Sequence, residues 1–317
     1  MYGLKLDWME TPEAPYYTLE DYTGPEARWC PGCGDFAVLT AAQRLCRDEQ
    51  LAPEKTVFVS GIGCSSRFPH YMKTYGFHGL HGRALPVACG IRARRPDLNI
   101  FVATGDGDCC SIGSAHWIHA VRYNMRMVVM MFDNNVYGLT KNQTSPTSPE
   151  GLRTYTHPRG APIEGMDPLQ VSLAVRGVSF IAQTVDFNPQ HLLATLTAAY
   201  HHPGFAFVRI LQRCPHYTPR AFAPLQENPS MMSLLVHPDG IDGGESMTRL
   251  FPNRIEHDPS DLRGARVIAE AEQGIPVGLL YKNDSVPRYD HASASGLSAT
   301  REDRVKLLEQ QLDWFRI

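Results

Sequence analysis

Apolar and polar residues follow two alternating patterns along most of the chain. Short continuous apolar runs, rich in β-branched residues and bounded by Gly, Asn or Asp, predict buried strands at 55–60, 99–104, 127–133, 178–185 and 205–211. Apolar residues at helical spacing predict helices at 35–48, 85–96, 114–124, 168–176 and 188–200. Strands that alternate with helices predict an α/β fold, a doubly wound and mostly parallel sheet with helices on both faces.

The same pattern suggests three regions. The α/β domain extends over residues 35–215, with Asp35 as the expected cap of its first helix. Residues 1–34 are predicted to be an irregular lead-in, and residues 216–317 an irregular C-terminal extension that wraps a partner subunit or shields the site. In that extension, "HPDGIDGGES" and "YDHASASGLSAT" predict loops, and "REDRVKLLEQQLDWFRI" predicts a surface or partner-binding helix.

Composition narrows the class of protein. The 317 residues are 43% hydrophobic and 20% charged, which is typical of a soluble globular protein. A net charge of −3 argues against nucleic-acid binding, and no apolar run approaches the roughly 18 residues that a membrane helix needs. No signal-peptide pattern precedes the domain, so we expect a cytoplasmic protein whose eight cysteines are mostly reduced.

The first chemical motif follows the strand predicted at 99–104, in "ATGDGDCCSIGSA". Gly105 and Gly107 permit a tight turn with close backbone approach, and the next helix offers free N–H groups to an anion. Asp106 could hold a hard cation. This motif alone is a weak signal, because many plain strand-to-helix turns look the same.

A second motif strengthens the first. The next strand ends in Asp133-Asn134-Asn135, one βαβ unit later. Because neighbouring parallel strands end at the same edge of a sheet, we expect Asp106 and Asn134 to lie side by side. Their oxygens and a nearby backbone carbonyl would supply half of an octahedral Mg²⁺ site, with a diphosphate and water supplying the rest.

The motif "WCPGCGD", residues 29–35, is ambiguous by itself. It could be a thioredoxin-like redox pair, half of a zinc site, half of an iron–sulfur site or an ordinary tight turn. No predicted strand precedes it, and its Pro-Gly order is the reverse of the usual redox motif. The thioredoxin-like interpretation is therefore the weakest.

Five motifs in order resemble one family. "WCPGCGDF", "GIGCSSR", "HGRALPVACGI", "GDGDCCSIG" and "DNNVYGLTKNQTSPT" together are similar to the β subunit of 2-oxoacid:ferredoxin oxidoreductases over residues 28–215. The resemblance implies the thiamine diphosphate-binding (PP-type) fold. It also implies oxidative decarboxylation of a 2-oxoacid to acyl-CoA and CO₂, or the reverse, with electrons passed to ferredoxin.

The resemblance also implies roles for individual residues. Asp106, Asn134 and the main-chain oxygen of Val136 would bind Mg²⁺. The residues expected around thiamine diphosphate are Gly105, Gly107, Asp108, Gly138, Leu139 and Thr140 at the diphosphate, and Ile62, Gly63, Cys64, Ser65, His81, Gly82, Arg83 and Ala84 on the other side. Alternatively, His81 is a hydrogen-bonded residue at a strand end and Arg83 pairs with a nearby carboxylate.

One 4Fe–4S cluster is implied by four cysteines of the motifs. They are Cys30, Cys33, Cys64 and Cys214. Zinc suits four thiolates too, although structural zinc sites usually use two close pairs. Cys109 and Cys110 are interpreted as packing residues that line the cofactor pocket.

The resemblance further implies partners and a substrate. An α subunit would supply the glutamate that activates thiamine, most simply in an α2β2 heterotetramer. The loop "GLTKNQ" differs from the "GLTGGQ" of pyruvate-type relatives, so Lys141 could bind the distal carboxylate of 2-oxoglutarate, unless it is merely solvated. The alternatives are a pyruvate or broad-specificity enzyme, a non-redox thiamine decarboxylase with structural zinc, and a non-catalytic binding module.

Overall fold

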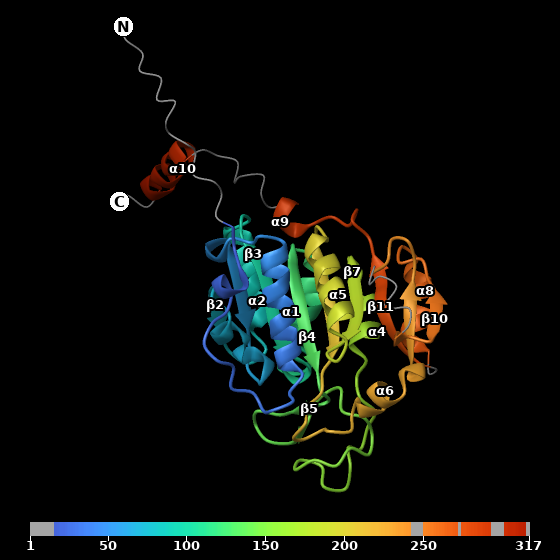
Figure 1. Cartoon of the computed structure of the whole chain (residues 1–317). Coiled ribbons are helices and arrows are strands. Elements are labelled where there is room, and N and C mark those ends of the chain that lie inside the picture. Colours follow the sequence, from blue (N-terminus) through green and yellow to red (C-terminus); the bar gives the residue numbers. More distant parts are fainter. Residues whose placement is uncertain (1–15, 242–249, 272–273, 293–300, 315–317) are drawn as a thin grey trace.

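The computed structural model places most of the chain in one α/β body (Figure 1). It describes residues 16–241, 250–271, 274–292 and 301–314. The N-terminal part of the predicted lead-in and parts of both predicted loops of the extension lie outside these ranges. No helix in the described ranges is long and apolar enough to cross a membrane.

A sheet of nine strands forms the centre of the body. In chain order the strands are β1 (Thr56–Ser60), β2 (Tyr75–His78), β3 (Asn99–Gly105), β4 (Met127–Asp133), β7 (Phe180–Val185), β8 (Phe205–Leu211), β9 (Met232–Val236), β10 (Asn253–Glu256) and β11 (Ile275–Lys282). Their spatial order is β10-β9-β11-β7-β8-β4-β3-β1-β2, and every neighbouring pair is parallel except β7 with β11. The predicted mostly parallel sheet is confirmed.

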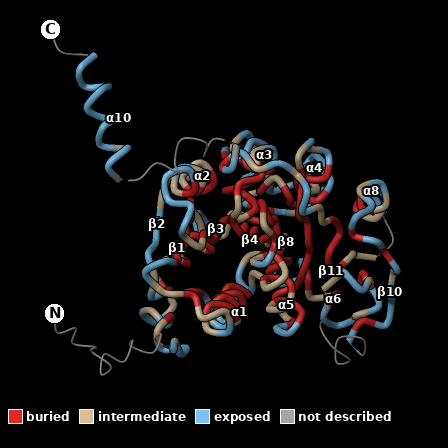
Figure 2. Tube along the Cα trace, turned by 90° about the horizontal axis from the view of Figure 1, so that it is seen from above, coloured by how far each residue is buried: buried red, intermediate tan, exposed pale blue. Residues whose placement is uncertain are grey.

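Helices cover both faces of the sheet. Their bounds are α1 (Asp35–Asp48), α2 (Ala84–Arg94), α3 (Ser114–Tyr123), α4 (Pro168–Ala174), α5 (Pro189–His201), α6 (Ala223–Glu227), α8 (Leu262–Glu270), α9 (Tyr289–Ala292) and α10 (Arg301–Asp313). Helices α1 and α5 pack on one face, and α2, α3, α4 and α8 pack on the other (Figure 2). The doubly wound arrangement predicted from the sequence is therefore present.

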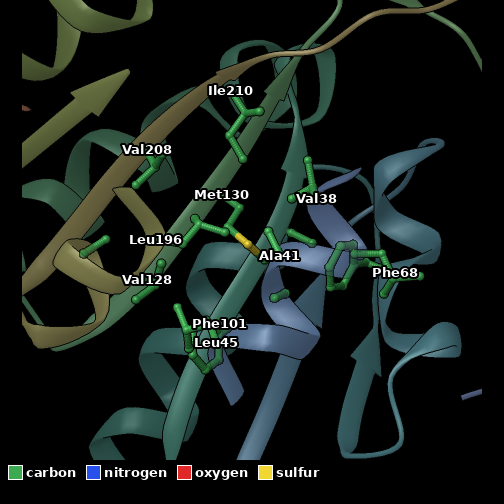
Figure 3. Packing of buried hydrophobic residues seen from close by; sticks show 14 of the residues in the cluster. Val38, Ala41, Leu45, Phe68, Phe101, Val128, Met130, Leu196, Val208 and Ile210 are labelled. Carbon is green, nitrogen blue, oxygen red and sulfur yellow. The ribbon is translucent and has the colours of Figure 1, made fainter. Parts of the chain in front are cut away.

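Strand β4 shows how the sequence builds both cores. Its side chains alternate between the faces, so Val128 and Met130 pack with α1 and α5 (Figure 3), while Val129 and Met131 pack with α2 and α3. All seven of its residues are buried, which explains why it reads as a continuous apolar run. Truncating such a buried methionine to alanine typically costs about 2–5 kcal/mol.

The prediction of an irregular C-terminal extension was wrong for much of residues 216–317. Strands β9, β10 and β11 and helix α8 lie there, and the three strands extend the central sheet beyond β7. A third apolar cluster, which includes Val185, Leu211, Leu234 and Val277, joins them to the rest of the sheet. The predicted final helix is confirmed over 301–313 as α10, which exposes Leu308 and Leu312, and residues 315–317 lie outside the described ranges.

Candidate active site

A cavity of about 470 Å³ lies at the carboxyl ends of β1, β3 and β4. Parallel sheets bind ligands at this edge. The predicted site residues that line it are Ile62, Gly63, Cys64, Ser65, His81, Gly105, Asp106, Gly107, Asp108, Asn134, Val136, Gly138, Leu139 and Thr140. The structure thus brings together residues from four of the five sequence motifs, and we call this space the diphosphate cavity.

Three of the residues predicted to bind the cofactor, Gly82, Arg83 and Ala84, do not line the diphosphate cavity. Gly82 lies behind it with a left-handed φ of 71°, and its N–H donates to Asp108 at 2.7 Å. Ala84 is buried as the first residue of α2. The Arg83 guanidinium contacts Nε2 of His116, so its partner is an imidazole rather than the carboxylate considered from the sequence.

Asp108 holds three segments of the site together. Its Oδ1 accepts hydrogen bonds from the backbone N–H of Ile62 at 3.0 Å and of Gly82, and lies 2.7 Å from Nδ1 of His81. Its Oδ2 accepts from the Thr104 hydroxyl at 2.7 Å. These hydrogen bonds fix the position of the Asp108 carboxylate. With Nδ1 of His81 donating to Asp108, Nε2 is the ring nitrogen left for other partners.

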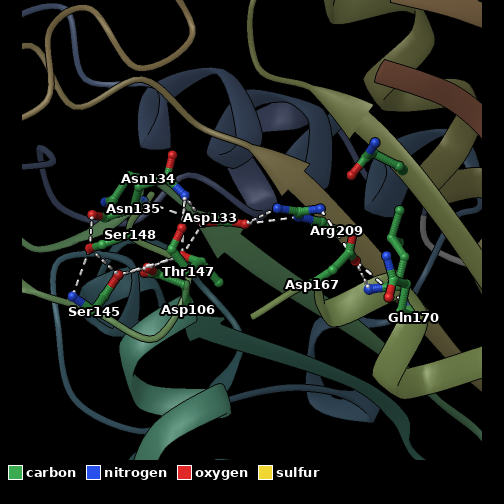
Figure 4. A network of polar contacts seen from close by, with 12 residues as sticks. Asp106, Asp133, Asn134, Asn135, Ser145, Thr147, Ser148, Asp167, Gln170 and Arg209 are labelled. Atoms are coloured by element: carbon green, nitrogen blue, oxygen red, sulfur yellow. Dashed lines mark hydrogen bonds and ion pairs between the residues drawn. The ribbon is translucent and has the colours of Figure 1, made fainter. Parts of the chain in front are cut away.

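Asp106 belongs to a second buried network, which Figure 4 shows. Its Oδ2 accepts from the hydroxyls of Ser145 at 2.5 Å and Thr147 at 2.7 Å. The Thr147 hydroxyl also lies 2.7 Å from Oδ1 of Asp133, whose Oδ2 pairs with Arg209 at 2.7 Å. One hydroxyl carries one proton, so Thr147 cannot donate to both carboxylates at once.

This crowding of buried carboxyl groups makes Asp106 a suitable cation ligand. Burial, followed by the nearby Asp133, raises the pKa of Asp106 to about 7. A cation beside the carboxylate would offset both effects. The donor set at this end of the cavity, with a carboxylate, the Asn134 amide and backbone carbonyls, consists of oxygens of the type that Mg²⁺ prefers.

The three residues of the predicted Asp133-Asn134-Asn135 motif have two different roles. Asn134 lines the cavity, and its Oδ1 accepts from the Val136 N–H at 3.2 Å. Asn135 adopts a left-handed φ of 59°, which asparagine tolerates well, and its Nδ2 donates to the Thr147 carbonyl at 2.9 Å. Asp133 and Asn135 are buried behind the cavity, where they fix the turn that presents Asn134.

The Gly107 backbone is covered closely by Tyr137. The Tyr137 hydroxyl donates to the Gly107 carbonyl at 3.1 Å, and a Cβ on residue 107 would overlap the tyrosine ring. Sequence reasoning missed Tyr137 as a cavity residue, together with Gln143, Thr144 and Thr156. The short run of hydroxyl residues after the Asn pair was the one available signal, because the path of the loop over 143–157 cannot be derived from periodicity.

A second cavity, of about 270 Å³, lies against the first and is lined by all four predicted cluster cysteines. We call it the cysteine cavity. Its cysteines are Cys30, Cys33, Cys64 and Cys214. Cys64, Asn134, Gly138 and Leu139 line both cavities, so the two spaces are direct neighbours.

Loops rather than strands position these cysteines. Gly32 takes a φ of 80°, and the Cys33 N–H donates to the Cys30 carbonyl at 3.0 Å, which closes the tight turn between the pair. Trp29 fixes the other loop, because its Nε1 donates to the Cys64 carbonyl at 2.7 Å. Gly34 is required for space, since a Cβ there would overlap the Asp186 carboxylate.

The surroundings of the cysteine cavity are charged. Burial raises the pKa of the Cys64 thiol to about 12 and raises that of Cys33 further, so both sulfurs need a cationic partner to become thiolates. Asp35, predicted as a helix cap, is instead the first residue of α1 after an N-cap at Gly34. Both carboxylate oxygens of Asp35 are buried without a hydrogen-bond partner, and burial raises its pKa to about 7.

Lys141 lines the cysteine cavity and is absent from the lining of the diphosphate cavity. The backbone turns sharply there, with left-handed φ values of 74° at Lys141 and 55° at Asn142. Cys109 and Cys110 are packing residues, as predicted, but they lie in the core with α2 and α3 rather than in the cavity lining.

Comparisons with known proteins agree with this geometry. The family model described as "Thiamine pyrophosphate enzyme, C-terminal TPP binding domain" matches residues 61–210. The chain is 33% identical to the 2-oxoacid:ferredoxin oxidoreductase subunit beta of Saccharolobus solfataricus, over 93% of this chain and 88% of that one. It is 44% identical to the 2-oxoglutarate oxidoreductase subunit KorB of Mycobacterium tuberculosis, over 66% of this chain but only 56% of that relative.

A solved structure is similar over nearly the whole length. It is the 2-oxoglutarate:ferredoxin oxidoreductase from Magnetococcus marinus with 2-oxoglutarate, coenzyme A and succinyl-CoA bound. The TM-score is 0.80 at 33% identity, and the match covers 94% of this chain and 97% of that chain.

Proposed function

This chain belongs to the family of 2-oxoacid:ferredoxin oxidoreductase β subunits, and from that premise we propose that it binds thiamine diphosphate, Mg²⁺ and one 4Fe–4S cluster. The observation that carries the proposal is the contact between the two cavities, which share Cys64, Asn134, Gly138 and Leu139. A catalytic cofactor and an electron acceptor placed in them would be immediate neighbours.

The diphosphate cavity suits its proposed ligand. Asp106, the amide oxygen of Asn134 and the main-chain oxygen of Val136 would hold Mg²⁺, and the close backbone turn at Gly107 would receive the diphosphate. When bound, thiamine diphosphate supplies the nucleophilic carbon and the electron sink for decarboxylation of a 2-oxoacid. The chain itself orients the cofactor, and Asp108 keeps the His81 ring in place beside it.

The cysteine cavity favours a cluster over zinc. Structural zinc sites usually take their ligands from two close pairs, whereas Cys64 and Cys214 each stand alone in the sequence. The four cysteines instead surround a space, as a larger cluster requires. Arg28, Arg67 and Lys141 line that space and would balance the negative charge of a thiolate-bound cluster.

A partner subunit is part of the proposal. No glutamate of the described residues lines the diphosphate cavity, so the carboxylate that activates thiamine would come from an α subunit, in an α2β2 assembly that reduces ferredoxin and transfers the acyl group to coenzyme A. All eight cysteines are free, which suits a reducing compartment, and we propose a cytoplasmic location.

The favoured substrate is 2-oxoglutarate. Relatives from Mycobacterium tuberculosis and Methanocaldococcus jannaschii carry this compound in their names, and the similar solved structure contains it. Pyruvate and broad 2-oxoacid specificity are the alternatives. Lys141 remains the candidate for the distal carboxylate, and it lies two residues after Leu139, which lines both cavities.

The experiment is anaerobic co-production with the α subunit from the same organism. We expect a brown complex with about four irons per β subunit that binds thiamine diphosphate only with Mg²⁺ and reduces a viologen when given 2-oxoglutarate and coenzyme A. The β subunit alone should bind the cofactor without turnover.

Two results would contradict the proposal. A colourless complex containing zinc would indicate the non-redox decarboxylase. Turnover by the isolated β subunit would show that its active site does not depend on an α subunit.

A further inference from the structure

Gln212 connects the two cavities through its buried side chain. It follows the last residue of β8, and its backbone N–H donates to the Asp133 carbonyl at 2.8 Å, which continues the pairing of β8 with β4. Its Oε1 accepts from Nδ2 of Asn134 at 2.9 Å. Its Nε2 lies 3.3 Å from the sulfur of Cys33 and 2.6 Å from the Arg213 carbonyl.

The direction of each hydrogen bond in this chain of contacts is fixed. The Val136 N–H can only donate, so the Asn134 atom facing it is the amide oxygen and Nδ2 faces Gln212. Oε1 of Gln212 must then accept, and Nε2 faces Cys33 and the Arg213 carbonyl. Reversing the Gln212 amide would place like atoms against each other at both ends.

The packing leaves Gln212 little freedom. Its side chain is 1% exposed, and a Cβ at Gly34 would lie 2.9 Å from its Cγ. The Arg213 carbonyl that receives its Nε2 also accepts from the Gly34 N–H at 3.1 Å. Gln212 and the loop that carries Cys30 and Cys33 are therefore both held at the end of β8.

We propose that Gln212 is a positioning residue for both sites, an inference that rests on the proposed function. Toward the diphosphate cavity, it holds Nδ2 of Asn134 so that the amide oxygen is presented to the cation. Toward the cysteine cavity, it donates an N–H···S hydrogen bond to Cys33. Hydrogen bonds to cluster sulfurs stabilise the extra electron of the reduced form, so this bond raises the cluster's reduction potential.

Two substitutions separate these effects. Gln212→Leu removes both hydrogen bonds. Gln212→Glu keeps an oxygen that accepts from Asn134, but it replaces the N–H donor beside Cys33 with a negative charge. Gln183→Leu is the matched control, because Gln183 is also 1% exposed and makes its amide hydrogen bond to the Pro276 carbonyl, away from both cavities.

The measurements use the cluster-loaded complex with its α subunit. A redox titration followed by electron paramagnetic resonance gives the potential, and calorimetry gives the affinity for thiamine diphosphate with Mg²⁺. For Gln212→Leu we expect the equilibrium constant for cluster reduction to fall about tenfold, which lowers the reduction potential by about 59 mV for one electron. The potential should fall further in Gln212→Glu.

The two Gln212 variants should differ in their effect on cofactor affinity as well, but in the opposite sense. The affinity should fall about tenfold in Gln212→Leu, as outer-shell changes typically do, and stay near the wild-type value in Gln212→Glu. Gln183→Leu should change neither quantity. A general loss of stability would change cofactor affinity and reduction potential together. It therefore cannot rank the two Gln212 variants one way by potential and the other way by affinity.

The outcomes are distinguishable. A wild-type complex without iron would overturn the proposed function and this inference with it. A wild-type complex that holds the cluster, but whose potential and cofactor affinity are unchanged in both Gln212 variants, would overturn the inference alone. If Gln212→Leu does not fold, the potential of Gln212→Glu still decides the cluster half.

Discussion

The two neighbouring cavities share four lining residues, yet they are built from different parts of the fold. The diphosphate cavity lies on the ends of β3 and β4, and its buried polar groups hydrogen-bond one another, as Asp106 does with Ser145 and Thr147. The cysteine cavity lies between loops. Its sulfurs receive two hydrogen bonds among the described residues, one each at Cys33 and Cys214.

This difference separates a preorganised site from one that needs its ligand. The diphosphate cavity is held by the sheet and by hydrogen bonds among its own buried groups. The cysteine sulfurs have few hydrogen bonds of their own among the described residues, and bonds to a cluster would add links between the loops that carry them. Loss of the cluster should therefore cost local structure as well as electron transfer.

The largest expected effect is on cluster retention. Cys33→Ala should abolish bound iron and increase proteolysis within residues 28–34, because one of four ligands and a loop contact are lost together. Cys46→Ala is the control, since Cys46 is a fully buried residue of α1 that packs in the core with α5. It should retain iron and lose only about 1–2 kcal/mol of stability. Full iron content in Cys33→Ala would show that Cys33 is not a cluster ligand.

A smaller effect separates ligand binding from folding within the diphosphate cavity. Asp106→Asn should weaken Mg²⁺-dependent cofactor binding by about 100-fold, at the upper end of what is seen for metal-site changes. Without metal it should raise the free energy of unfolding by about 1 kcal/mol, because the buried repulsion with Asp133 is removed. Calorimetry and urea denaturation measure the two quantities.

Asp108→Asn should behave in the opposite way. The amide oxygen can still accept from the N–H groups of Ile62 and Gly82, but the amide NH2 then replaces the oxygen that accepts from the Thr104 hydroxyl, and the negative charge is lost. Unfolding should therefore become easier by about 1–3 kcal/mol. Equal stability losses in Asp106→Asn and Asp108→Asn would remove the distinction between a ligand and an anchor.

The smallest effect tests which cavity Lys141 serves. If it binds the distal carboxylate, Lys141→Ala should raise KM for 2-oxoglutarate about tenfold, equivalent to about 1.4 kcal/mol, and leave KM for 2-oxobutyrate unchanged. Lys141→Gly should do the same while relieving roughly 1 kcal/mol of strain at its left-handed φ. Equal KM changes for both substrates, with a lower cluster potential, would assign Lys141 to the cysteine cavity.

Sequence patterns predicted β1, β3, β4, β7 and β8, and missed β2 and β11 for reasons that their residues show. Strand β2 is exposed at all four residues, so it has neither an apolar run nor alternation. Strand β11 does carry an apolar run, but Pro276 and Gly278 interrupt it, and Gly278 takes a φ of 130° next to a register shift. Proline and glycine usually argue against a strand interior.

The candidate site was predictable to the extent that it lies on strand ends. Asp106 and Asn134 lie together because adjacent parallel strands end at one edge. The cysteines came from family resemblance, since residues as distant as Cys30 and Cys214 have no local signal that pairs them. Gln212 and Tyr137 escaped prediction because their roles depend on side-chain contacts that only the folded loops create.

The buried glutamine between the cavities has a thermodynamic consequence. If Gln212 hydrogen-bonds both Asn134 and Cys33, cation binding at one end and electron uptake at the other are linked equilibria. If the bound cation makes reduction of the cluster more favourable by some factor, reduction must increase the affinity for the cation by the same factor. A reduced cluster would then hold the cofactor's metal more firmly, and the enzyme would keep its cofactor longest while it waits to pass an electron on.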